Sequence, residues 1–171
     1  MKSVVVYESC YGNTRSIAEA IAGALSEAGE AALVSVDDPM PDLAGFDLVV
    51  VGGPTHIHGL STSMSRKGAL KDHPNAAPPG IGVRGWLHEL PAGEGRRAAA
   101  FDTRIEKSIV LVGSAARTIA RPLRRHAYEL AAEPESFFVV DADGPLKDGE
   151  TERAAAWART LAAHTPAIAV R

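Results

Sequence analysis

The sequence predicts an α/β fold: a three-layer, doubly wound α/β/α arrangement around a five-stranded parallel sheet. Short apolar runs rich in β-branched residues alternate with amphipathic segments of helical period along the chain. Apolar runs without polar alternation indicate strands that are buried on both faces, which is typical of a parallel sheet covered by helices. Right-handed crossovers follow from chain chirality, and ligands in such folds bind outside the carboxyl ends of the strands.

Three of the strands are predicted in the first half of the chain, at residues 4–7, 31–36 and 47–52. The helix after the first strand spans residues 15–28, because its apolar residues recur at helical spacing and Gly29 follows where helices commonly end. Residues 53–59 form the loop after the third strand. A further helix is expected to begin near residue 63, and the Pro- and Ala-rich residues 73–80 are expected to form an exposed loop.

The second half is expected to supply helices at residues 83–90, 116–130 and 151–163 and strands at residues 97–101 and 136–140. Residues 102–108 should leave the fourth strand as a loop. Residues 109–112 form either a strand or an extended loop. Within the helix at residues 116–130, Pro122 removes a backbone donor and should kink or delay the helix, and Ser114 is expected as its N-cap.

Length, charge and cysteine content limit the classes of function. The 171 residues suffice for one domain with a full core, so a single domain over residues 1–171 is expected. A formal net charge of -3 argues against a general nucleic-acid binder, and no apolar run approaches the ~20 residues of a membrane span. The chain shows no signal-peptide pattern, and its one cysteine, Cys10, excludes an intrachain disulfide, so a cytoplasmic location is expected.

The most informative motif is the loop at residues 9–14, between a buried strand and a helix. Helix N-termini present free N–H groups and favour anions, and the side chains of Ser9, Asn13 and Thr14 add donors. Gly12 lets the backbone turn tightly. Because the loop lacks both the Walker A and the Gly-x-Gly-x-x-Gly patterns, it suits a terminal phosphate monoester. The alternative is an ordinary hydroxyl cap of the helix.

Residues 8–14, Glu-Ser-Cys-Tyr-Gly-Asn-Thr, resemble the phosphate loop of the flavodoxin-like family, which binds flavin mononucleotide (FMN). That loop is usually Thr/Ser-x-Thr-Gly-x-Thr, and Tyr11 stands where the second Thr is usual. The family's WrbA-related quinone reductases also place an aromatic residue near this point. The resemblance covers residues 3–163 and implies the strand order 2-1-3-4-5. It also implies that the phosphate lies against Ser9, Tyr11, Gly12, Asn13 and Thr14.

The resemblance extends to two later loops. Residues 52–59, Gly-Gly-Pro-Thr-His-Ile-His-Gly, are similar to the family loop that packs along the isoalloxazine ring, although they lack the aromatic residue that flavodoxins often carry there. The residues implied on that side of the ring are Pro54, Thr55, His56 and Gly59. Thr103 and Arg104 are implied on the other side. The alternatives are plain loop histidines or a metal site without an evident third ligand, and for Arg104 a surface pair with Glu106.

The family resemblance implies redox chemistry with FMN, in one of two forms. One is a carrier that passes single electrons to a partner protein, and the other is a reductase that takes hydride from NAD(P)H for a quinone or another small acceptor. A flavodoxin-like binding module without cofactor is the third hypothesis. No catalytic residue and no metal site is predicted. Cys10 is interpreted as a small loop residue, and the arginine face at Arg117, Arg121 and Arg124 either is solvated or contacts an acidic partner.

Overall fold

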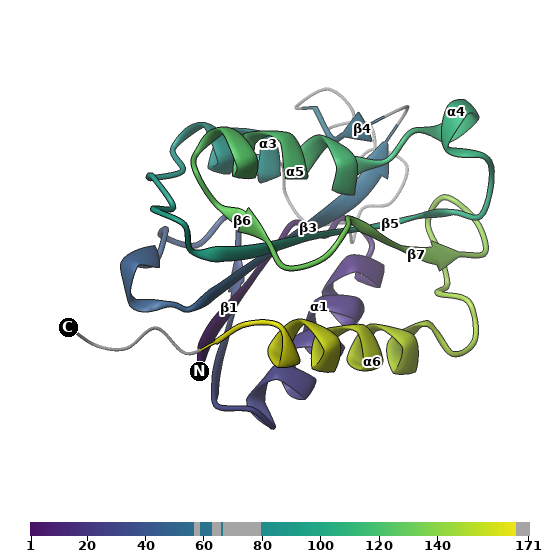
Figure 1. The fold of residues 1–171 in the computed structure, drawn as a ribbon. Coiled ribbons are helices and arrows are strands. Elements are labelled where there is room, and N and C mark those ends of the chain that lie inside the picture. Colours follow the sequence, from purple (N-terminus) through teal and green to yellow (C-terminus); the bar gives the residue numbers. More distant parts are fainter. Residues whose placement is uncertain (57–58, 63–65, 67–79, 167–171) are drawn as a thin grey trace.

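The computed structural model describes residues 1–56, 59–62, 66 and 80–166. A central sheet separates two helical layers, as Figure 1 shows. One layer contains α1 (Asn13–Ser26) and α6 (Glu150–Ala163), and the other contains α3 (Gly82–His88) and α5 (Ala115–Arg125). The predicted three-layer α/β/α class is confirmed.

The main strands are β1 (Lys2–Tyr7), β2 (Glu30–Ser35), β3 (Leu48–His56), β5 (Arg97–Ile105), β6 (Glu129–Leu130) and β7 (Glu135–Val139). They pair in parallel in the order β2-β1-β3-β5, and β6 and β7 both pair with β5, at successive registers. Because β6 and β7 occupy one position in the sheet, they form a single fifth strand interrupted at residues 131–134. This is the predicted order 2-1-3-4-5.

Apolar residues on both faces of the sheet form two core clusters, one under each helical layer. The central residues of β1 and β3 are fully buried, as their unbroken valine runs predict. On one face, Ile17, Ile21 and Leu25 of α1 pack against the sheet, at the helical spacing that the sequence shows. On the other face, Ile119 and Leu123 of α5 are equally buried.

Two strands extend further than predicted at their carboxyl ends. β5 continues to Ile105, because residues 101–105 pair with β7, so the expected loop at residues 102–108 begins later. β3 continues to His56, and the short antiparallel strand β4 (Gly59–Leu60) pairs with its end. The expected loop at residues 53–59 is therefore partly strand. In both cases the polar side chains that look like a loop in the sequence lie in paired strands.

Three expectations for helices need correction. Residues 109–112 form a short helix, α4 (Ile109–Val112), because the Ser108 side chain caps it by accepting the N–H of Val110. α5 ends at Arg125 instead of residue 130, because Ala127 adopts a φ of 61° and the chain turns into β6. Pro122 lies inside α5 without delaying it, since the helix begins at Ala115.

Most of the segment where a helix was expected from residue 63 and a loop at residues 73–80 lies outside the described residues, and so does His58. None of the helices that the structure describes has the length and apolar character needed to cross a membrane.

Candidate functional site

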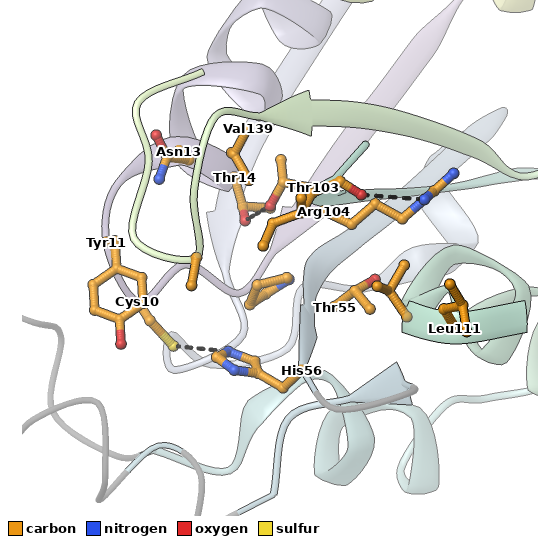
Figure 2. A pocket seen from close by; sticks show the side chains of 14 residues that line it. Cys10, Tyr11, Asn13, Thr14, Thr55, His56, Thr103, Arg104, Leu111 and Val139 are labelled. Carbon is orange, nitrogen blue, oxygen red and sulfur yellow. Dashed lines mark hydrogen bonds between the residues drawn. The ribbon is translucent and has the colours of Figure 1, made fainter. Parts of the chain in front are cut away.

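A cavity of about 320 Å³ opens at the carboxyl ends of the central strands (Figure 2). The loop after β1, the ends of β3 and β5, α4 and the loop after β7 surround it. The predicted site residues that line it are Tyr11, Asn13, Thr14, Pro54, Thr55, His56, Thr103 and Arg104. The predicted loops therefore meet at the place where doubly wound sheets bind ligands.

Of the predicted site residues, Ser9, Gly12 and Gly59 do not line this cavity. Ser9 and Gly12 lie in the loop beside it, between β1 and α1. Gly59 begins β4 and pairs with His56. The structure thus brings the first loop and the end of β3 to the same cavity, and Gly59 lies on the strand that pairs with His56.

The loop between β1 and α1 gathers backbone donors around one point. The Oγ of Ser9 accepts the N–H of Gly12 at 3.1 Å and the N–H of Arg15 at 3.2 Å. Gly12 has a φ of 91°, and a Cβ there would meet no atom within 4 Å, so the backbone conformation and not the space favours glycine. Two N–H groups that converge on one oxygen at a helix N-terminus form the geometry of an anion site.

Side chains expected near the phosphate also tie the loops together. Thr14 Oγ1 lies 2.7 Å from Thr103 Oγ1 in a buried hydrogen bond, which joins the start of α1 to β5. Asn13 Nδ2 donates to the carbonyl of Asp143 at 3.0 Å, in the loop after β7. These two hydrogen bonds fix the positions of α1, β5 and the loop after β7 relative to one another.

Cys10 and His56 meet in the wall of the cavity, with Sγ and Nε2 separated by 3.8 Å (Figure 2). Burial, with a smaller contribution from Glu8, raises the pKa of the Cys10 thiol to about 11. Burial also lowers the pKa of His56 below its ordinary range. Both groups are therefore neutral near pH 7 and do not form the thiolate–imidazolium pair of a cysteine nucleophile. The contact joins residues 46 positions apart, which is why the sequence shows no base near Cys10.

The lowered pKa of His56 predicts a loss of stability on acidification. The unfolded chain takes up the proton near pH 6.5 and the folded chain only at lower pH, so the free energy of unfolding should fall as the pH drops below 6.5. We expect the difference between urea unfolding at pH 7.5 and at pH 5.5 to be smaller in His56→Gln than in the wild type. An equal difference in the two proteins would contradict the neutral, buried imidazole.

Arg104 does not form the alternative pair with Glu106, which instead contacts Lys147. Its guanidinium donates to Ser136 Oγ at 3.0 Å and to the carbonyl of Lys107 at 2.7 Å. The same group lies 5.0 Å from the ring centroid of Phe138. Figure 2 shows it directed away from Tyr11 and His56. The positive charge of Arg104 therefore lies at the β7 side of the cavity.

The buried side chain of Asp102 holds Thr55 of the cavity wall in place, a role that the sequence did not indicate. Its side chain is fully buried, and Oδ2 accepts from Thr55 Oγ1 at 3.0 Å, from Ser114 Oγ at 2.7 Å and from the N–H of Ala116 at 2.9 Å. Ser114 is the N-cap of α5, as predicted, and accepts the N–H of Arg117. Asp102 thus fixes Thr55 of the cavity to the start of α5.

A second buried carboxylate, Glu8, supports the first loop. Its side chain is 5% exposed and accepts the N–H of Val83 at 2.8 Å and the hydroxyl of Ser61. The guanidinium of Arg66 lies 4.0 Å from the same carboxylate and donates to Ser61 at 2.8 Å. The hydrogen bond from Val83 joins the end of β1 to α3, and the buried ion pair joins it to Arg66.

The sequence reasoning also missed the apolar part of the cavity wall, which comprises Ile105, Leu111, Val112, Val139 and Ala142. Leu111 and Val112 reach the cavity only because residues 109–112 form α4, which the sequence did not indicate. Leu111 is 67% exposed and lies at the rim. Ile105 and Val139 reach the cavity because β5 and β7 extend to this edge of the sheet.

Comparison with known proteins agrees with this architecture. Residues 4–76 match the family model of the flavodoxin domain. Flavodoxin 1 from Bacillus cereus has a TM-score of 0.70 at 18% identity, covering 97% of this chain and 100% of that chain. A flavodoxin from the domain Archaea has a TM-score of 0.66 at 21% identity, covering 95% and 97%. The WrbA-like protein from Agrobacterium tumefaciens has a TM-score of 0.61 at 17% identity, covering 95% of each chain.

No curated protein matches the sequence. The solved structures establish the fold, and the family model covers the first loop, β3 and the residues between them. The resemblance read from residues 8–14 is thereby confirmed: the chain has the flavodoxin-like fold, and its residues 4–76 carry the pattern of the flavodoxin domain.

Proposed function

We propose that this chain binds FMN in the cavity at the strand ends and acts in electron transfer. The observation that carries the proposal is the convergence of the Gly12 and Arg15 N–H groups on one point, at a helix N-terminus and beside a cavity. A phosphate oxygen can take the place that the Ser9 hydroxyl has in this arrangement. FMN, when bound, supplies one- and two-electron redox chemistry.

The donors around the cavity suit an anionic, partly apolar ligand. None of the described residues that line it is acidic, and Arg104 adds a positive charge at one wall. Pro54, Thr55 and His56 offer one side to a flat ring, and the apolar residues of α4 and β7 limit its contact with water. Tyr11 of the first loop provides an aromatic side chain in the cavity lining. The sequence after β3 lacks the aromatic residue that flavodoxins often carry there.

Exposed apolar residues beside the cavity favour the carrier among the redox hypotheses. In α4, Val110 is 88% and Leu111 is 67% exposed, and Val140, next to the lining residue Val139, is 58% exposed. Exposed apolar residues gathered at a cavity mouth are typical of a contact site for another protein. The reductase remains the second candidate, because Tyr11 departs from the flavodoxin loop toward the pattern of the WrbA-related reductases.

Binding of the phosphate is tested by titrating the apoprotein with FMN and with riboflavin, which lacks the phosphate, and following flavin fluorescence. Several charge-assisted hydrogen bonds to the phosphate should make FMN bind roughly 100-fold more tightly than riboflavin. Equal affinities would contradict the phosphate site. If neither flavin is quenched, the cofactor-free binding module is favoured instead.

Carrier and reductase are separated by anaerobic mixing of the FMN-loaded protein with NADPH. For a carrier we expect no bleaching of the flavin absorbance until a separate flavodoxin reductase is added. Rapid bleaching by NADPH alone would contradict the carrier and favour the reductase.

Replacing Thr14 with Val should weaken FMN binding and destabilise the apoprotein. The loss of one charge-assisted hydrogen bond lowers the affinity by roughly 1–3 kcal/mol. The apoprotein should lose about 1 kcal/mol of unfolding free energy, because the Thr103 hydroxyl keeps no partner. Thr14→Ser, which retains the hydroxyl, is the matched control in both the flavin titration and urea unfolding. An FMN affinity that is unchanged in Thr14→Val would place the phosphate elsewhere.

A further inference from the structure

α3 and α5 lie side by side on one face of the sheet (Figure 1) and enclose an open groove of about 840 Å³, here called the basic groove. Its charged and titratable lining residues are Arg84 and His88 of α3, and Arg121, Arg124, Arg125 and His126 of α5 and its C-terminal end. Among the described residues, none lines both the basic groove and the cavity at the strand ends. Two residues of the arginine face of α5, Arg121 and Arg124, therefore line one wall of a groove, whereas Arg117 lies outside it.

The positive charge of the basic groove is not balanced locally. None of the described residues that line it is acidic. Elsewhere in the described part of the chain arginines pair with carboxylates, as Arg15 does with Glu19 and Arg159 with Glu27. By contrast, no described residue forms a salt bridge with any of the four groove arginines. The groove thus concentrates positive charge at one place on a protein whose formal net charge is -3.

The length and lining of the basic groove suit a polypeptide. Leu60, Leu87 and Pro122 supply the apolar part of the lining, here called the floor. The α5 wall, residues 118–126, extends about 12 Å at 1.5 Å per residue, which equals roughly four residues of an extended chain. Arginine binds carboxylates through two parallel N–H donors, and it is enriched at protein–protein interfaces.

We propose that the basic groove binds an acidic segment of a partner protein, with carboxylates on the arginines and apolar side-chain atoms on the floor. A nucleic acid is disfavoured, because the positive charge is limited to one short groove of a net-negative chain. The site goes beyond the proposed electron transfer. It is separate from the FMN cavity, so occupation of one should leave the affinity of the other unchanged.

The test uses a fluorescein-labelled hexaglutamate peptide, followed by fluorescence anisotropy at low salt, with a hexaglutamine peptide as the uncharged control. The wild-type chain should bind only the acidic peptide, and binding should weaken as salt screens the charges. Arg84→Glu and Arg121→Glu, one from each wall, should each weaken binding by about fivefold. Addition of FMN should change none of these values.

Arg117→Glu is the matched control, because Arg117 is exposed on α5 one turn before Arg121, lies outside the groove and undergoes the same change of charge. Its affinity for the peptide should stay within a factor of two of the wild type.

An equal loss of affinity in Arg117→Glu and Arg121→Glu would overturn the proposal, because it would show diffuse electrostatic attraction instead of binding in the groove. Tighter binding of inorganic triphosphate or of an oligonucleotide than of the peptide would also overturn it. So would a wild-type dimer that Arg121→Glu dissociates. If Arg121→Glu does not fold, Arg121→Gln serves in its place.

Discussion

Replacing Ser9 with Asp is expected to lower the affinity for FMN by at least roughly 100-fold without loss of the fold. A carboxylate at this position can accept the N–H groups of Gly12 and Arg15 that the Ser9 hydroxyl now accepts. Two like charges about 4 Å apart repel by about 4 kcal/mol at an effective dielectric constant of 20, which would exclude a phosphate. Flavin fluorescence titration measures the affinity.

The stability of the same variant should move in the opposite direction. A carboxylate near the N-terminus of α1 interacts favourably with the helix dipole, so the free energy of unfolding should stay the same or rise by about 0.5 kcal/mol. Ser9→Ala is the control: it frees both N–H groups for the phosphate and should change FMN affinity only a few-fold. If Ser9→Asp binds FMN as the wild type does, the phosphate does not lie in this loop.

Replacing Asp102 with Ala should produce the largest loss of stability among these substitutions, about 3 kcal/mol in the free energy of unfolding. Three donors, Thr55 Oγ1, Ser114 Oγ and the N–H of Ala116, share one buried carboxylate oxygen. Removing the acceptor leaves these groups without it in a water-excluded site, and each buried unsatisfied group costs about 1–3 kcal/mol. Urea unfolding of the apoprotein measures the loss.

Asp102→Asn is the matched control for the acceptor. Its amide oxygen can accept the same three donors, so about 1 kcal/mol should be lost, from weaker hydrogen bonds to a neutral acceptor. Because Thr55 lines the cavity, Asp102→Ala should also weaken FMN binding, whereas Asp102→Asn should not. Equal stabilities of the Ala and Asn variants would contradict the role of Asp102 in joining Thr55 to α5.

The parallel α/β class was predictable because the apolar runs of β1 and β3 are unbroken and buried on both faces. The order of the strands followed from the family resemblance of the first loop. The ends of the strands were not predictable. Asp102, Thr103 and Arg104 look like a loop in the sequence, yet they pair with β7 and are buried because their side chains find partners in other elements. These partners come from elements that are distant in the sequence, so the local pattern of residue types does not reveal them.

Contacts between distant segments were also unpredictable at the two candidate sites, the cavity at the strand ends and the basic groove. The loop at residues 9–14 was recognisable because its residue types and its place between a strand and a helix are local properties. The contact of Cys10 with His56 was not, because it joins the ends of β1 and β3. The arginine face of α5 was visible at Arg121 and Arg124, but the groove depends on the placement of α3 beside it. Local patterns therefore predicted the place of this loop between β1 and α1 far better than the surfaces around it.

Binding of the FMN phosphate by the loop at residues 9–14 is tested most directly by amide chemical shifts in ¹H–¹⁵N correlation spectra. On addition of FMN, the amides of Gly12 and Arg15 should show the largest shifts in the first loop, because their N–H groups exchange the Ser9 hydroxyl for a phosphate oxygen. Riboflavin should shift them far less. Shifts confined to Arg121 and its neighbours in the basic groove, or equal shifts with both flavins, would contradict the assignment.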